Sequence, residues 1–192
     1  MNTMNRNTLG RYVGRSMGYC ARLAVAMAAL PLADCAGPQI GDHVGDQSTF
    51  DFKQYFDGTV MGHGLINDRG GKVLRRFVVT MRCQWAGDKG TLNEDFVYDD
   101  GERQHRVWEV QRQPDGRYVA TAADVVGQAQ GVAAGAAFNW RYTLKLPVRG
   151  SVYEIQFDDW MHRIDDKIVI NKVVMSKFGI RVGELTLAFS RP

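Results

Sequence analysis

Residues 138–146 run Phe138-Asn-Trp-Arg-Tyr-Thr-Leu-Lys-Leu146, an unbroken alternation of apolar and polar side chains. Successive side chains of a β-strand point to opposite faces, so this stretch predicts a strand with one buried face and one wet face. Leu185, Leu187 and Phe189 repeat the alternation near the C-terminus. This pattern decides the fold class.

The same alternation extends over most of the chain beyond residue 58. Turn residues interrupt it, among them Asp99-Asp-Gly101 and Pro114-Asp-Gly116. Asp-Gly pairs between alternating runs are typical of β-hairpins. We therefore expect strands at 59–66, 72–85, 91–98, 103–112, 117–122, 137–146, 151–163, 167–176 and 181–190. The Gly/Ala-rich stretch 127–137 fits either a short helix or one more strand of small residues.

About nine or ten antiparallel strands joined by short turns leave two edges that must be covered, and closure into a barrel removes both. We predict an all-β fold, an antiparallel up-and-down barrel. A two-sheet β-sandwich is the alternative.

Composition and charge exclude several classes of protein. Of the 192 residues, 45% are hydrophobic and 23% are charged, which rules out a disordered chain and a polytopic membrane protein. The first 34 residues hold four of the 24 basic residues and one of the 21 acidic ones, so the remainder carries 20 of each. A neutral body lacks the basic surface that nucleic acid requires, and we expect no nucleic-acid partner.

Residues 1–34 are typical of an export signal, in which arginines precede an apolar run over 23–33. That run is far shorter than the roughly 20 apolar residues of a membrane-spanning helix. Both Met1 and Met17 fit as the start. We expect three regions: the export signal 1–34, a Gly/Asp/Gln-rich tether 35–50, and one barrel domain 51–192.

The leader ends in Leu32-Ala-Asp-Cys35, which resembles the lipobox of bacterial lipoproteins. The resemblance implies cleavage before Cys35 and a diacylglycerol on its thiol, and two or three acyl chains suffice for a stable membrane anchor. Asp34 departs from the small residue usual there, and the alternative is a leader cut elsewhere or retained. Ala36 lacks the aspartate that often retains lipoproteins at the inner membrane. We therefore expect a bacterial envelope protein at the outer membrane, facing the periplasm.

Cysteine usage points to a free thiol in the body. Cys20 leaves with the leader and Cys35 carries lipid, so Cys83 has no partner. Cys83 lies in phase with apolar neighbours and should be buried and inert. Without lipid on Cys35, a Cys35–Cys83 disulfide is the alternative.

Four charged residues lie in phase with apolar neighbours on predicted inward faces. Buried charges are costly unless they are paired, so we expect an interior charge network or a wet cavity; the alternative is a position at strand ends, where water reaches them. The four are Arg75, Glu94, Arg106 and Asp159.

If the barrel holds a ligand, two of these residues are the candidates for its acidic group, and aromatic residues in the same phase form the apolar wall. The candidates for the acidic group are Arg75 and Arg106, and those for the wall are Trp108, Trp140, Tyr142 and Phe157.

Motifs of catalysis and metal binding are missing from the sequence. His43, His63, His105 and His162 show no metal-ligand spacing, and no serine lies in a Gly-x-Ser-x-Gly elbow. Adjacent Asp158 and Asp159 lie in one predicted strand, so they point to opposite faces and cannot act as a dyad. We predict no metal, no cofactor and no catalytic residue.

Six strings, spread over nearly the whole body, resemble one family. It is domain of unknown function 3833, whose bacterial members are often labelled lipoproteins. The resemblance implies an exported, lipid-anchored protein of lipocalin-like fold, and it supplies no catalytic residues. The strings are Tyr55-Phe-Asp-Gly58, Glu94-Asp-Phe-Val-Tyr-Asp-Asp-Gly-Glu102, Arg106-Val-Trp108, Ala123-Asp-Val-Val-Gly127, Phe157-Asp-Asp-Trp-Met161 and Met175-Ser-Lys-Phe-Gly179.

Three function classes follow. The first is an envelope lipoprotein whose barrel binds a lipid, a fatty acid or another hydrophobic small molecule without catalysis. The second is a structural lipoprotein with a side-chain-filled barrel that docks to an unidentified envelope partner. The third is a hydrolase or isomerase, which requires Asp159 or Glu94 with a raised pKa in a cleft.

Overall fold

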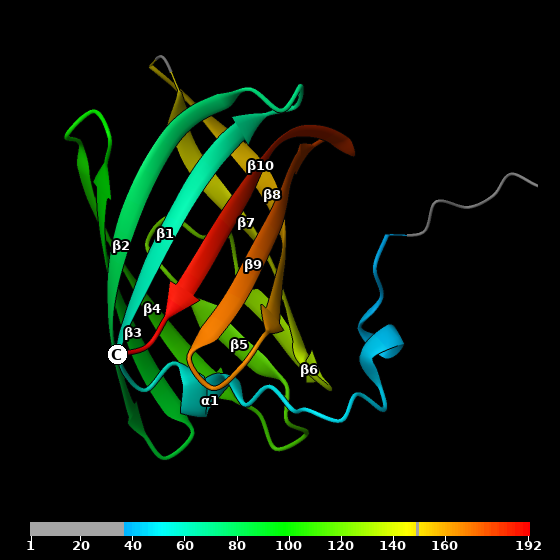
Figure 1. Ribbon diagram of the computed structural model, residues 1–192. Coiled ribbons are helices and arrows are strands. Elements are labelled where there is room, and N and C mark those ends of the chain that lie inside the picture. The colour runs from blue at the N-terminus through cyan, green and yellow to red at the C-terminus, as the bar shows by residue number, and fades with distance from the viewer. Residues whose placement is uncertain (1–36, 149) are drawn as a thin grey trace, which may run out of the picture. The chain divides into compact units, whose positions relative to one another are not determined.

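The computed structural model describes residues 37–148 and 150–192, and in this part of the chain ten strands form one closed barrel (Figure 1). Each strand pairs antiparallel with its neighbours in sequence, and β1 pairs with β10 to close the ring. This confirms the predicted up-and-down barrel and excludes the two-sheet sandwich. The leader, Cys20 and Cys35 lie outside the described residues.

The strands agree with the predicted ranges to within a few residues at each end. The stretch 127–137, which the sequence left open, contributes a strand, β6. The strands are β1 (Gly58–Asp68), β2 (Val73–Ala86), β3 (Lys89–Tyr98), β4 (Arg103–Arg112), β5 (Tyr118–Thr121), β6 (Ala129–Ala134), β7 (Ala137–Val148), β8 (Ser151–Arg163), β9 (Ile168–Lys177) and β10 (Ile180–Ser190).

Small residues in β6 make room for large ones in β7. Gly131 pairs with Trp140, and a Cβ atom on Gly131 would lie 2.1 Å from Cε3 of the Trp140 ring. No side chain fits in that space, so the tryptophan ring occupies the inner surface of β6. The Gly/Ala composition that made this stretch ambiguous is therefore a packing requirement.

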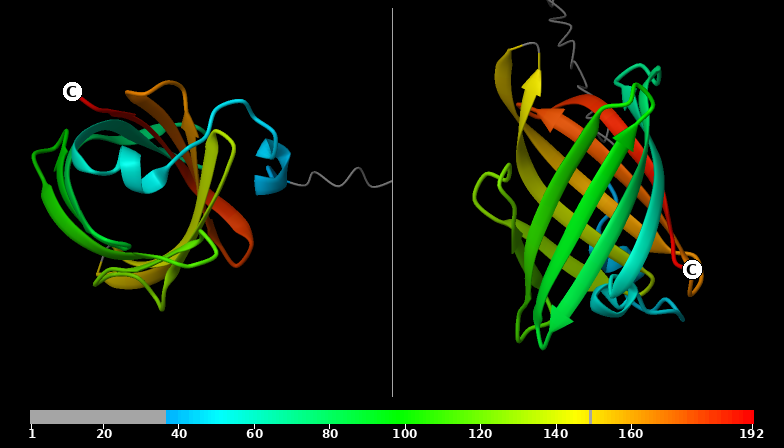
Figure 2. Two further views of the ribbon diagram at one scale, coloured as in Figure 1. Left: turned by 90° about the horizontal axis from the view of Figure 1, so that it is seen from below. Right: turned by 90° about the vertical axis from the view of Figure 1, so that its left-hand side faces the viewer.

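A short helix, α1 (Phe52–Tyr55), lies at the lower end of the barrel in Figure 1, and Figure 2 shows that end from below. Asp51 caps it by accepting a hydrogen bond from the backbone N–H of Gln54, at 3.0 Å. The ring of Phe52 stacks on Phe138 with centroids 4.4 Å apart, and the indole N–H of Trp85 donates to the Phe56 carbonyl at 2.6 Å. We call this the closed end, and the end formed by the β1–β2, β3–β4, β7–β8 and β9–β10 turns the open end.

Part of the expected tether packs against the barrel. A 3₁₀ helix, η1 (Ile40–His43), brings the His43 ring to 6.1 Å from the Trp160 ring on the outer face of β8. Phe50 is buried, and its N–H donates to the Gly135 carbonyl at 2.7 Å. Packing against the barrel thus begins before residue 51.

Candidate ligand-binding site

A cavity of about 180 Å³ lies inside the barrel above α1. Phe52 and Phe56 line its floor, and most of its wall is aliphatic or aromatic. Towards the open end the lining residues Tyr98, Leu146 and Met175 are only half-buried. The interior is therefore filled at one end and hollow towards the other.

The wall between β4 and β7 is incomplete because β5 and β6 are short. β4 pairs with β5 only over 109–112, and β6 pairs with β7 only up to Arg141. The loop 122–128 covers part of the gap: the N–H of Val126 donates to the Thr143 carbonyl at 2.9 Å, and the N–H of Lys145 donates to the Asp124 carbonyl at 2.8 Å. The loop thus carries Asp124 to the edge of the cavity.

All four residues predicted as an apolar wall line this cavity. Trp108 and Tyr142 meet edge to face with ring centroids 5.3 Å apart, and Tyr142 stacks on Phe157 at 5.0 Å. Trp108 also meets Trp140 at 6.0 Å. Their register on β4, β7 and β8 places these rings on the inner face, as the alternation predicted.

Arg106 is the cation of the cavity, and two carboxyl groups hold it. Glu94 lies directly opposite on β3, with its Oε2 3.5 Å from Nη1 of Arg106. Nε and Nη2 of Arg106 donate to both carboxylate oxygens of Asp124, at distances between 2.7 and 3.1 Å. Such two-point contacts fix the guanidinium plane, so Arg106 ties β4 to the loop that covers the gap.

Asp159 projects inward from β8, five strands around the barrel from Glu94. Its carboxylate accepts hydrogen bonds from the Tyr142 hydroxyl at 3.3 Å and from the Asn171 amide. Its neighbour Asp158 turns outward and accepts from Nε of Arg141 at 3.1 Å. The two aspartates lie on opposite faces, as predicted.

Burial governs the ionisation of these groups. It raises the pKa of Asp159 to about 7, against the lowering effect of the hydrogen bonds from Asn171 and Tyr142. Burial likewise raises the pKa of Glu94, and the Arg106 guanidinium only partly opposes this. Removing a carboxylate from water penalises its charged form. Two inward-facing carboxyl groups thus hold their protons more tightly than they would in water.

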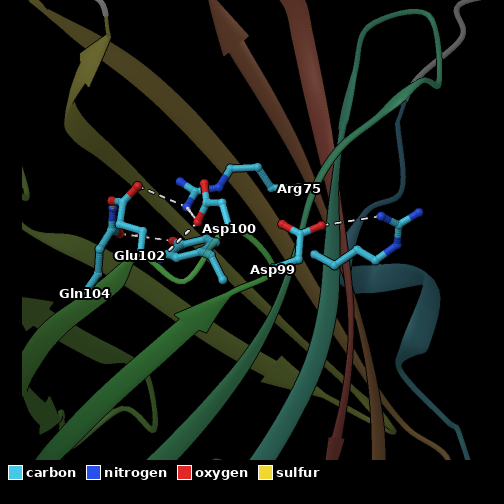
Figure 3. A network of polar contacts seen from close by, with 7 residues as sticks. Arg75, Asp99, Asp100, Glu102 and Gln104 are labelled. Atoms are coloured by element: carbon cyan, nitrogen blue, oxygen red, sulfur yellow. Dashed lines mark hydrogen bonds and ion pairs between the residues drawn. The ribbon is translucent and has the colours of Figure 1, made fainter.

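Arg75 does not join this cluster. It lies at the open end, where Nη2 contacts Asp100 at 2.8 Å and Glu102 at 3.0 Å (Figure 3). Its guanidinium carbon also lies 3.7 Å from the centroid of the Tyr98 ring. Of the four charges predicted on inward faces, the structure brings Glu94, Arg106 and Asp159 to one cavity and leaves Arg75 on the rim with its own partners.

Sequence reasoning missed Asp124 and Asn171. Asp124 lies in a loop, where alternation assigns no inward or outward face. Asn171 is in phase with Val169 and Val173, so its inward position on β9 was predictable. Its contact with Asp159 depends on the β8–β9 register, which the sequence does not give. In the sequence, each is only a polar residue beside apolar ones. That pattern does not identify a site residue unless its contact partner is known.

The described residues contain no cluster of histidine, cysteine and acidic side chains that could hold a metal ion. Cys83 is buried, as predicted, and has no disulfide partner within the described residues. Burial raises the pKa of its thiol to about 12. Within the same residues no helix has the length and hydropathy to cross a bilayer.

Comparison with known families and structures agrees with this architecture. The sequence model of a family described as protein of unknown function, DUF3833, matches residues 29–191. The chain belongs to the DUF3833 family. This confirms the resemblance seen in the sequence. Comparison with curated proteins gives no match for this DUF3833 chain.

Two solved structures resemble the DUF3833 barrel to different degrees. An S-type phycobiliprotein lyase, CPES from Guillardia theta, superposes with a TM-score of 0.53 at 8% identity, over 73% of this chain and 90% of that one. A redesigned β-barrel, mFAP0, bound to DFHBI, gives a TM-score of 0.40 at 13% identity, over 71% and 99% of the two chains. At 8% identity the likeness to the lyase concerns the fold alone.

Proposed function

We propose that this barrel binds a small, mostly apolar molecule in its cavity and performs no chemistry on it. The cavity of about 180 Å³ carries the proposal. An apolar cavity of about 150 Å³ is large enough to bind benzene, so a single ring with a short arm matches the available space. A long lipid chain would have to extend out through the open end.

The form of the cavity supports binding over a filled barrel. Barrels of about eight strands either fill with side chains or hold one small ligand, and a ten-stranded barrel is wider. Here α1 fills only the closed end, while Trp108, Tyr142 and Phe157 face open space. Pockets for small molecules combine such apolar walls with a few polar groups.

The raised pKa values of Glu94 and Asp159 also meet one requirement of the third function class, a hydrolase or isomerase. The carboxyl of Asp159 is, however, already engaged by Tyr142 and Asn171, an arrangement that fixes these side chains. Binding explains the cavity without a reaction, so it remains the proposed function.

We also propose that the protein is anchored in the bacterial envelope by lipid on Cys35, at the outer membrane. The family match includes the Leu32-Ala-Asp-Cys35 stretch, which supports a role for it. Expression of the full chain in a bacterial host, followed by intact-mass measurement, tests this. We expect a diacyl or triacyl mass on a chain beginning at Cys35, and a Cys35→Ala variant without it; an unlipidated wild-type chain would refute the anchor.

Native mass spectrometry of the full chain, before and after incubation with a mixture of small apolar compounds, tests the binding function. We expect a one-to-one adduct of small-molecule mass. The variant Leu185→Trp, which fills the cavity from β10, should lose the adduct. Leu74→Trp, at an exposed position of β2, should keep it.

A clean apo mass under every condition would refute binding. So would an adduct that persists in Leu185→Trp. Either result would favour the docking protein of the second class.

A further inference from the structure

One carboxylate oxygen in the cavity wall accepts no hydrogen bond. Oε2 of Glu94 is buried and has no hydrogen-bond partner among the described residues. Nη1 of Arg106 lies 3.5 Å away and forms an ion pair with this oxygen, at a distance longer than that of a normal hydrogen bond. A buried acceptor without a donor is unfavourable, and a ligand that brings an N–H group would relieve this cost.

Acidic groups outnumber basic groups around the cavity. The charged residues that line it are Glu94, Arg106 and Asp159. Arg106 also donates to Asp124, which lies just outside the lining. Three carboxyl groups and one guanidinium thus lie in or beside the cavity. A ligand anion would find Arg106 already paired with Glu94 and Asp124. A ligand cation would find Glu94 sharing its only guanidinium with Asp124, and Asp159 held by the neutral Tyr142 and Asn171 within the described residues.

Aromatic rings near Glu94 add to the attraction for a cation. The Arg106 guanidinium carbon already lies 5.8 Å from the Phe96 ring centroid and 5.9 Å from that of Trp108. The faces of such rings carry partial negative charge and attract cations within about 6 Å. Both the carboxyl groups and the aromatic rings of the polar part of the cavity therefore favour a positive charge.

We propose that the ligand of this barrel is a small organic cation, a protonated amine whose N–H groups are held by Glu94 and whose apolar body packs against Trp108, Tyr142 and Phe157. The inference rests on the proposed function. It replaces the expectation that Arg75 and Arg106 receive an acidic group, because each guanidinium already pairs with two carboxyl groups of the protein. Burial raises the pKa values of Glu94 and Asp159, and a bound cation would favour the charged form of both carboxyl groups.

Three probes of similar size separate charge from shape: 2-phenylethylamine, propylbenzene and phenylacetate, titrated into the full chain with tryptophan fluorescence as the readout. We expect the amine to bind at least about tenfold more tightly than propylbenzene, because one charge-assisted hydrogen bond contributes roughly that much. Phenylacetate should bind most weakly. A ranking with phenylacetate first, or with amine and propylbenzene equal, would overturn the proposal.

Glu94→Gln keeps the size of the side chain and removes its charge. We expect the amine to lose about tenfold in affinity while propylbenzene is unaffected. Asp95→Asn is the matched control, since Asp95 is adjacent on β3 but faces outward, towards Arg82 and His105. An amine affinity unchanged by Glu94→Gln would refute the role of Glu94.

The outcomes distinguish the two proposals. Binding of propylbenzene without preference for the amine would refute only the ligand class. Failure of all three probes to bind would refute the proposed function as well. If Glu94→Gln does not fold, the ranking of the probes on the wild-type chain still decides the question.

Discussion

At the closed end of the barrel, α1 inserts Phe52 between the walls, and its ring stacks on Phe138 and Trp140. At the open end a turn and a strand end carry apolar side chains into solvent: Phe178 of the β9–β10 turn is 88% exposed and Val152 of β8 is 66% exposed. The strands that build the two ends are the same and alternate in the same way. What differs is whether another segment of the chain covers the end.

The two ends of the barrel therefore contribute differently to stability and to function. Packing at the closed end buries the rings of Phe52, Phe56 and Phe138, and burial of aromatic rings is a large contribution to stability. The hollow at the other end costs packing energy, since side chains that face empty space lose dispersion contacts. A barrel built only for stability would fill both ends, so the hollow end is where function is expected.

The largest effect expected from this comparison is at Phe52. Phe52→Ala removes a buried ring that touches four other aromatic rings of the barrel, and should lower the free energy of unfolding by about 3–5 kcal/mol. Urea denaturation followed by tryptophan fluorescence measures this. Leu74→Ala, at the exposed open end, should change it by less than about 0.5 kcal/mol.

If Phe52→Ala lowers the free energy of unfolding no more than Leu74→Ala does, α1 is not part of the core and does not hold the lower end of the barrel closed. An intermediate loss with a smaller denaturant slope would indicate that α1 detaches while the barrel stays folded.

The barrel walls were predictable from the sequence and the closure of one end was not. Alternation such as Phe138-Asn-Trp-Arg-Tyr142 reports which side of a strand faces inward, and Asp-Gly turns report where strands end. A helix of four residues, α1, is too short to show a helical period, so its insertion at the closed end left no signal.

The candidate site was likewise predictable only in part. Alternation identified the inward faces of Glu94, Arg106 and Asp159, but it gives no height along the barrel axis. Arg75 therefore looked equivalent to Arg106, although it lies on the rim. Asp124 belongs to a loop, and its pairing with Arg106 arises because the short strands β5 and β6 leave a gap in the wall.

The hollow part of the barrel should also show in the pH dependence of stability. The folded-state pKa of Asp159 is about 7 against an ordinary value of 3.8, so between these values the folded chain binds more protons than the unfolded chain. Asp159 therefore reduces stability as pH rises from about 4 to about 7, by at most about 1.4 kcal/mol per pH unit. The Asp159→Asn variant should not lose stability in this way, so its free energy of unfolding should rise relative to that of wild type as pH increases.

Urea denaturation of both proteins from pH 4 to pH 8 checks this prediction. Asp158→Asn is the control, because Asp158 faces outward to Arg141 and should leave the pH dependence as in wild type. Parallel stability curves for wild type and Asp159→Asn would mean that the Asp159 carboxyl ionises as it does in water, and that the hollow end is wetter than its lining indicates.

The smallest effect concerns the turn at the open end that joins β9 to β10. Phe178 has φ 53° and Gly179 φ 75°, a two-residue turn with both central residues left-handed, in which Asn-Gly is preferred. A bulky residue in that conformation costs about 1–2 kcal/mol, and an 88% exposed ring regains little of it. Phe178→Asn should therefore raise the free energy of unfolding by about 0.5–1 kcal/mol, which thermal denaturation can measure. A gain would show that the open end, unlike the closed one, carries an aromatic ring that folding does not require; a loss would show that Phe178 packs on its neighbours after all.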